Sequence, residues 1–395
     1  MGRLPTRTLL NNTLGFALAF AAWVALGPAA RSVGAELGLS PGATEWLRAT
    51  PMLTGSVLRI PIGVLADRLG ARRTFSALLL AGAGGALVLA SAQGTVAAFS
   101  GALILGLVGT TFVVGVQAVS AQTPGPLRGT ALGLFGAGNL GTALTTMGLP
   151  WVLEAWGWRP AMVGYAAVLG LSAVGYWAAA GDSDADKPRV TSSAGSALKP
   201  LAHPDAWRLS LAYAASFGGF LCLSLTLTDW YADLGRELKA AGTLATVFTF
   251  TASLARIPGG WVADRWPTRP WLRISLAVAG LLVLPTLLRW PLGIAVPALF
   301  AAALSMGVAM TATFRAIPER FPTQVGAVGG LVGALGGLGG FFLPPLGAAL
   351  ETATAWQGVR FLPLVLLGLV AAALAPRTRR AAADDVNEPS LRRAA

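Results

Sequence analysis

Two arginines stand inside apolar stretches of this 395-residue chain. Arg59 lies in PMLTGSVLRIPIGVLA, residues 51–66, and Arg256 lies in SLARIPGGWVA, residues 253–263. A charged side chain at the centre of a membrane costs roughly 2.5–3.5 kcal/mol even on lenient insertion scales. A guanidinium group stays protonated and presents a planar fork of donors. Two such groups facing each other would suit a small planar oxyanion that accepts bidentate hydrogen bonds from both sides.

Other site chemistries find little support in the sequence. The single cysteine, Cys222, excludes an internal disulfide, and together with the single histidine, His203, it excludes a metal site built on these residue types. No phosphate-binding loop is present, so we expect no cofactor, no metal and no enzyme activity. All 17 acidic residues are expected in loops or at the ends of apolar segments. No acid is then available to neutralise the two arginines, which predicts that the substrate is an anion.

The composition is that of a membrane protein with many spans. Hydrophobic residues make up 54% of the chain and charged residues only 12%, whereas soluble domains carry about 25% charged residues. Apolar runs of about 20 residues are long enough to cross a bilayer. Twelve such runs are expected, near 12–33, 43–66, 74–92, 97–121, 129–153, 160–180, 208–232, 240–263, 271–290, 293–317, 324–350 and 357–376.

The formal charge of +12 follows from the topology. With both termini cytoplasmic, lysine and arginine concentrate on the inner side, as the positive-inside rule requires. We therefore expect no nucleic-acid partner and a multi-pass protein of the cell inner (plasma) membrane, surrounded by the lipid bilayer.

The two arginines are expected at the same depth. Arg59 precedes Asp67 by eight residues, which corresponds to about 12 Å of helix at 1.5 Å per residue. This distance reaches close to the middle of a hydrocarbon core about 30 Å thick. Arg256 precedes Asp264 by the same spacing, so the two side chains should face each other near the midplane.

An internal repeat divides the chain. LRIPIGVLADRLGARR at 58–73 returns as ARIPGGWVADRWPTRP at 255–270, and GNLG at 138–141 is echoed by GGLG at 336–339. Parallel repeats of this kind place a transport site between them. The predicted fold is an all-α membrane protein with twelve helices in two pseudo-symmetric halves. The expected parts are an N-terminal half (1–180), a cytoplasmic linker (181–206), a C-terminal half (207–376) and a basic cytoplasmic tail (377–395).

The stretch GVLADRLGARR, residues 63–73, resembles the loop motif between the second and third spans of the major facilitator superfamily. The resemblance implies the fold described above and a conformational gate at the cytoplasmic membrane edge. The gate residues it implies are Gly63, Asp67, Arg68 and Arg72, with a weaker copy at Asp264 and Arg265, where Pro267 replaces a glycine. The alternative is that these charges only anchor the topology without switching.

Four elements together resemble the nitrate/nitrite porter family: LRIP, ARIP, LGLFGAGNLGTAL at 132–144 and GALGGLGGFFLPPLG at 333–347. The resemblance implies that Arg59 and Arg256 bind the anion and that Asn139 donates a hydrogen bond to it. Aromatic candidates near the anion are Phe112, Phe220 and, less specifically, Trp23. The signature glycines it implies are Gly136, Gly138, Gly141, Gly336, Gly337, Gly339 and Gly340.

Alternatives to these roles are structural. The arginines could bond carbonyls freed by Pro61 and Pro258, the aromatics could serve packing alone, and glycine-rich helices commonly serve close helix contact. Arg315 and Glu319 are one helical turn apart, which predicts an i,i+4 ion pair.

The expected function is transport of nitrate, nitrite or both by alternating access, in nitrate assimilation, by a monomer. Geometry alone would also admit bicarbonate, formate or a larger carboxylate; only the resemblance favours nitrogen oxyanions. Because the spans offer no acid at the midplane, the only histidine lies in the linker and arginine cannot lose its proton, nitrate/nitrite exchange (antiport) is favoured over proton-coupled nitrate symport. Further alternatives are a carrier for another small anion such as a monocarboxylate, a proton-coupled efflux pump, and a transporter-like anion sensor.

Overall fold

The computed structural model describes residues 5–124, 127–180, 202–266, 268–321 and 325–376. Every regular element in these ranges is helical, which confirms the predicted all-α class. The expected basic tail and most of the expected linker, residues 181–201, lie outside the described residues.

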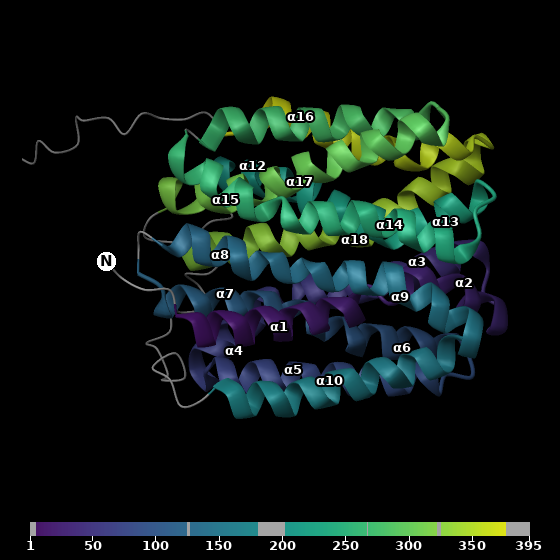
Figure 1. The fold of residues 1–395 in the computed structure, drawn as a ribbon, viewed down its shortest axis with the longest axis horizontal. Coiled ribbons are helices and arrows are strands. Elements are labelled where there is room, and N and C mark those ends of the chain that lie inside the picture. Colours follow the sequence, from purple (N-terminus) through teal and green to yellow (C-terminus); the bar gives the residue numbers. More distant parts are fainter. Residues whose placement is uncertain (1–4, 125–126, 181–201, 267, 322–324, 377–395) are drawn as a thin grey trace, which may run out of the picture.

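The helices run side by side along the long axis of the molecule (Figure 1). The first half of the chain forms α1 (Thr6–Trp23), α2 (Leu26–Glu36), α3 (Pro41–Val57), α4 (Arg59–Leu69), α5 (Ala71–Ala90), α6 (Thr95–Gly106), η1 (Leu107–Thr110), α7 (Thr111–Gln122), α8 (Arg128–Gly136), η3 (Ala137–Asn139), α9 (Leu140–Trp156) and α10 (Trp158–Ala180). The second half forms α12 (Pro204–Tyr213), η6 (Ala214–Gly218), α13 (Gly219–Asp233), α14 (Leu238–Leu254), α15 (Arg256–Arg265), α16 (Thr268–Leu287), α17 (Leu292–Arg320), α18 (Val325–Thr354), η7 (Gln357–Phe361) and α19 (Leu362–Leu374).

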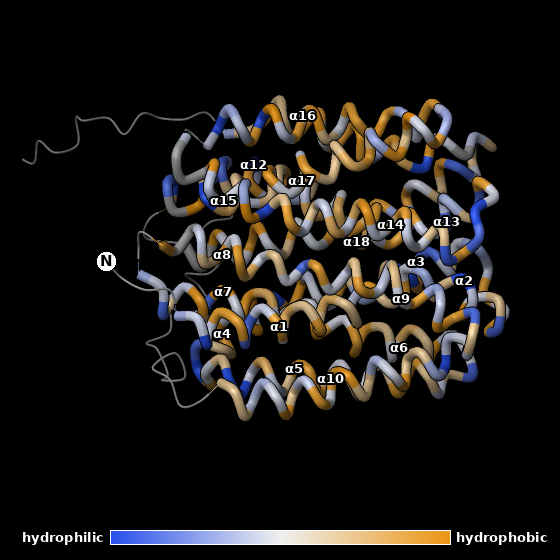
Figure 2. Tube along the Cα trace, viewed as in Figure 1, coloured by the Kyte–Doolittle hydropathy of each residue, from blue (hydrophilic) through white to orange (hydrophobic). Residues whose placement is uncertain are grey.

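The lengths and composition of these helices fit a membrane-spanning bundle. Within the described ranges, nine helices are long and apolar enough to cross a bilayer, or ten if the bent pair α3–α4 counts as one span. The order of the elements is consistent with the twelve expected spans. Figure 2 shows hydrophilic residues gathered at the two ends of the bundle and apolar residues along its length, the distribution that a bilayer requires.

The two halves of the chain pack against each other through a small number of helices. In Figure 1 the helices of the first half lie below those of the second half. Contacts between the halves come from α3 with α18, α9 with α14, α8 with α15 and α2 with α13. We call the end of the bundle that carries the N-terminus the near end, and the opposite end, with α2 and the start of α3, the far end.

Prolines break two equivalent helices just before the arginines. α3 and α4 meet at a 47° bend. A single residue, Ala255, separates the end of α14 from the start of α15. Proline lacks an N–H, and its ring clashes with the carbonyl four residues earlier. For Pro61 and Pro258 those carbonyls belong to Val57 and Leu254, the last residues of α3 and α14. Each break therefore places an arginine at the first position of the following helix.

Candidate anion-binding site

Arg59 reaches from the first half of the chain to the second. Its side chain is buried, with 1% exposed. The Nε atom donates to the Gly55 carbonyl at 3.0 Å, and Nη1 donates to the Gly333 carbonyl of α18 at 2.6 Å. Its Nη2 atom has no partner among the described residues. One arm of the guanidinium is therefore free to bind a ligand.

Three aromatic rings surround the Arg59 guanidinium. Its Cζ atom lies 5.6 Å from the Trp23 ring centre, 5.3 Å from that of Phe112 and 5.4 Å from that of Phe217. Such cation–π contacts gain strength where water is excluded. Trp23 is itself fixed by a hydrogen bond from its Nε1 to the Pro51 carbonyl at 2.8 Å. Two of the predicted aromatics, Trp23 and Phe112, thus lie beside Arg59.

The third predicted aromatic, Phe220, lies near the start of α13, three residues after Phe217. It is fully buried and packs on Phe217 and Phe248, with ring centres 6.2 and 6.1 Å apart. Phe217, which the sequence analysis did not single out, occupies the place over Arg59. It belongs to η6, a π-helical turn, and such turns are frequent at functional sites. Substrate contact by Phe220 stays a prediction.

Arg256 approaches the first half of the chain. Its side chain is 4% exposed, its Nη1 lies 3.8 Å from the Met310 sulfur, and its Nε has no partner within the described part of the chain. The guanidinium packs on Gly136, where an added Cβ would lie 2.7 Å from Arg256 Nε. The buried Tyr213 hydroxyl is close enough to interact electrostatically with both arginines. Nothing in the sequence distinguishes Tyr213 from a packing residue.

Asn139 is an unsatisfied polar residue in the core of the bundle. It is fully buried in η3, and neither its Oδ1 nor its Nδ2 has a hydrogen-bond partner among the described groups. Leaving a buried polar group unsatisfied costs about 1–3 kcal/mol. Asn139 follows Gly136, against which Arg256 packs, by three residues. A bound ligand would satisfy this amide.

The signature glycines make room for close contacts. An added Cβ at Gly336 would overlap the Tyr213 ring, and one at Gly337 would overlap the Ser56 side chain. The remaining members make similar contacts: Gly138 with Phe16, Gly141 with the Ala17 carbonyl, Gly339 with the Gly218 backbone and Gly340 with Leu221 and Met52. Small residues let helix backbones approach closely in lipid. The signature glycines therefore allow close helix packing, and one of them, Gly136, also makes space for Arg256.

The site carries positive charge that no described acidic residue compensates. Neither Arg59 nor Arg256 forms an ion pair within the described ranges. Arg59 is also close enough to Arg256 to be repelled by it. The buried acid Asp229 pairs instead with Arg48 at the far end. Neither residue was predicted to be buried, because both lie close to the ends of their expected spans.

The predicted gate residues lie at the near end. Gln117 Nε2 donates to the Gly63 carbonyl at 3.2 Å. Arg72 donates from Nε to the Trp177 carbonyl at 2.9 Å and lies 4.5 Å from the Trp177 ring centre. Asp67 is half-buried and Arg68 is exposed. The side chains of Asp264 and Arg265 lie outside the described residues, so the gate stays a prediction.

Arg315 forms the i,i+4 ion pair that the sequence predicted. Its Nη1 lies 3.3 Å from Glu319 Oε1. Glu319 therefore pairs with the Arg315 charge near the end of α17.

Comparisons with known proteins show what the chain is similar to. The family described as Major Facilitator Superfamily matches residues 13–229 and again 209–394. The chain is 35% identical to the "Probable nitrate/nitrite antiporter NarK1" of Thermus thermophilus, covering 93% of this chain and 89% of that protein. It is 29% identical to the "Nitrite extrusion protein" of Bacillus subtilis, covering 89% of each.

Solved structures share the fold at lower identity. The human organic anion transporter MFSD10 superposes with a TM-score of 0.72 at 16% identity, covering 95% of this chain and all of that one. A bacterial homologue of the human lysosomal transporter Spinster gives a TM-score of 0.68 at 20% identity, covering 95% and 97%. At these identities the likeness concerns the fold alone.

Proposed function

Because the chain belongs to the major facilitator superfamily, and within it to the nitrate/nitrite porter family, we propose that it carries nitrate, nitrite or both across a membrane by alternating access. The observation that carries the proposal is the pair of buried guanidinium groups, Arg59 and Arg256, without a described acidic partner. A monovalent anion between them would supply a missing counter-charge.

The chemistry of the site favours a small acceptor. The unsatisfied donors are Arg59 Nη2, Arg256 Nε and the Asn139 amide, and the surrounding walls are aromatic. Nitrate and nitrite offer only acceptor oxygens and a flat shape that fits between rings and guanidinium planes. The relatives named as nitrate or nitrite transporters support nitrogen oxyanions over carboxylates.

The mode of transport that we propose is nitrate/nitrite exchange. An empty carrier would have to move two uncompensated buried charges between conformations, and buried unpaired charges are costly. An anion bound on every passage removes that cost, which favours obligatory exchange. The relative from Thermus thermophilus, named an antiporter, supports this mode.

The cellular setting follows from the same proposal. The expected place is the plasma membrane, with both termini cytoplasmic, so that the far end faces outward. The protein would then act as a monomer in nitrate assimilation, without nucleic-acid or cofactor partners.

The purified protein in detergent tests the substrate class directly. Nitrate and nitrite are titrated against it calorimetrically, with formate and bicarbonate as planar competitors and chloride as a spherical control. We expect saturable binding of at least one nitrogen oxyanion and much weaker binding of the carboxylate. Binding of formate or bicarbonate without either nitrogen oxyanion would overturn the assignment.

A further inference from the structure

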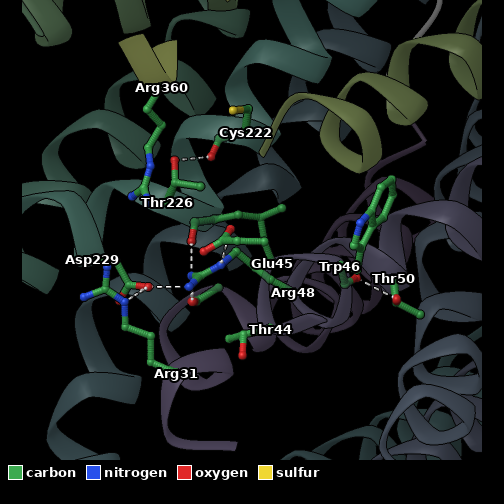
Figure 3. Close-up of polar contacts among 12 residues, drawn as sticks. Arg31, Thr44, Glu45, Trp46, Arg48, Thr50, Cys222, Thr226, Asp229 and Arg360 are labelled. Carbon is green, nitrogen blue, oxygen red and sulfur yellow. Dashed lines mark hydrogen bonds and ion pairs between the residues drawn. The ribbon is translucent and has the colours of Figure 1, made fainter. Parts of the chain in front are cut away.

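A cluster of ion pairs joins the two halves of the chain at the far end (Figure 3). Arg31 Nη1 and Nη2 each donate to one carboxylate oxygen of Asp233 at 2.7 Å, and Arg31 Nε lies 2.9 Å from Asp229. Arg48 Nη2 donates to the same Asp229 carboxylate. The arginines come from α2 and α3 of the first half, whereas the aspartates come from α13 of the second. We call these four residues the far-end cluster.

The centre of this cluster is buried and hydrogen-bonded on both sides of the interface. The side chains of Arg48 and Asp229 are 1% and 4% exposed. Arg48 Nη1 donates to the Leu225 carbonyl of the second half at 2.8 Å and to the Gly27 carbonyl of the first half. Arg48 Nε also lies 3.2 Å from Glu45. A single arginine therefore connects two helices of its own half to the facing helix of the other.

Beside the cluster, α13 carries two buried hydroxyl groups without a hydrogen-bond partner among the described residues. Ser224 and Thr228 are each 1% exposed, and their oxygens have no hydrogen-bond partner in the described part of the chain. Ser224 and Thr228 lie one helical turn apart, and Thr228 also lies one turn beyond Leu225, since residues three and four apart are neighbours on a helix. Leu225 lies directly against Gly27 of the first half. Thr228 thus lies beside the residue that contacts the other half, with Ser224 one turn before it, although buried polar groups normally have partners.

We propose that the far-end cluster is the outer gate of the transporter and that Ser224 and Thr228 line the outer access path that it closes. The inference rests on the proposed alternating-access function. Opening the far end must separate Arg31 and Arg48 from the two aspartates of α13. Water entering between the halves then solvates the separated charges and satisfies the two hydroxyls. The closed state has the ion pairs, and the open state has the hydrated path.

Cysteine accessibility tests the gate without any nitrate measurement. The native thiol is removed as Cys222→Ser, and Thr228→Cys or Ser224→Cys is introduced alone. The protein, in liposomes with the far end outward, is treated with a membrane-impermeant thiol reagent. We expect slow modification at both positions while the cluster is intact. In Arg48→Met, or in Arg31→Gln at a half-exposed position, modification should become about tenfold faster.

The control changes an ion pair that lies within one half. Glu36 pairs with Arg159 at 2.8 Å, both in the first half, so Glu36→Gln should leave the modification rate unchanged. Equal rates in the intact protein, Arg48→Met and Arg31→Gln would overturn the gate. The readout is thiol reactivity and does not depend on the substrate. The gate proposal can therefore fail while nitrate binding is intact, and it can hold even if the substrate proves to be another anion.

Discussion

At Arg59 and Arg256 the protein maintains two buried cations that differ in how they are held. Arg59 is fixed by two carbonyls and three aromatic rings, whereas Arg256 has one sulfur contact and the surface of Gly136. Each makes its cross-half contact with the glycine-rich helix of the opposite half. Movement of either half therefore moves an arginine relative to the anion between them.

Lysine at either position keeps the charge and loses the planar fork. We expect Arg59→Lys and Arg256→Lys to insert normally and to bind nitrate roughly 10- to 100-fold more weakly, the loss of one charge-assisted hydrogen bond of about 1.5–3 kcal/mol. Calorimetric titration of each variant measures the change. Nearly unchanged affinity together with lowered thermal stability would show that the arginines serve the proline-broken helices instead.

Asn139 offers a prediction in which stability and function move in opposite directions. Because its amide is buried and unsatisfied, Asn139→Ala should leave the anion-free protein as stable or more stable. The same change should weaken nitrate binding by roughly 2- to 10-fold, since a neutral hydrogen bond contributes about 0.5–1.5 kcal/mol. Thermal unfolding and titration of the same sample give both values. Lower stability with full affinity would make Asn139 a structural residue.

Several site residues could be predicted from the sequence, and the reasons for the others are physical. Arginine within an apolar helix is expensive enough to be noticed without a structure. Tyr213 and Phe217 looked like ordinary apolar residues, and the sequence gives no sign of the π turn at η6, which follows Tyr213 and contains Phe217. Arg48 and Asp229 lie near the ends of their expected spans, and only tertiary packing shows that they are buried together.

Among the helices, the break at each proline is the feature that positions the arginines. The repeated RIP sequence allowed both to be placed at equal depth, and the structure puts each at the first position of a broken helix. The bend of 47° at α3–α4 was not predicted; both helices of this pair contact α18.

The glycine-rich segment before Asn139 supports a helix-scale prediction. In Gly136→Ala the added methyl group would lie 2.7 Å from Arg256 Nε and displace the guanidinium. We expect nitrate flux into liposomes to fall about tenfold or more, while the protein still inserts and folds. The matched control is Gly148→Ala in the adjoining α9, where an added Cβ meets nothing within 4 Å. Equal flux in the two variants would contradict the role of Gly136.

Asp67, at the near end of α4, tests the predicted gate there. If Asp67 belongs to a cytoplasmic latch, Asp67→Ala should change turnover and the balance of inward and outward conformations more than nitrate affinity. Flux kinetics, titration and distance measurements between spin labels on the two halves separate these effects. A large loss of affinity with an unchanged conformational balance would argue against a latch.

For the whole molecule, the sequence repeat and the hydropathy pattern were sufficient to predict two packed halves of an all-helical bundle. The tight far-end contact between α2, α3 and α13 was not predictable, because it depends on charges that pair only once the halves meet.

The uncompensated charge between the halves has a consequence for energetics. Importing a monovalent anion against an inside-negative potential costs about 2.3 kcal/mol per 100 mV, so uptake requires coupling.

Counterflow in liposomes measures that coupling most directly. Labelled nitrate uptake is followed with and without nitrite inside, at matched pH, and again under an inward proton gradient without internal nitrite. Arginine cannot release its proton, so we predict uptake that requires internal nitrite and ignores the proton gradient. Uptake that follows the proton gradient and is indifferent to internal nitrite would contradict nitrate/nitrite exchange and establish proton-coupled symport.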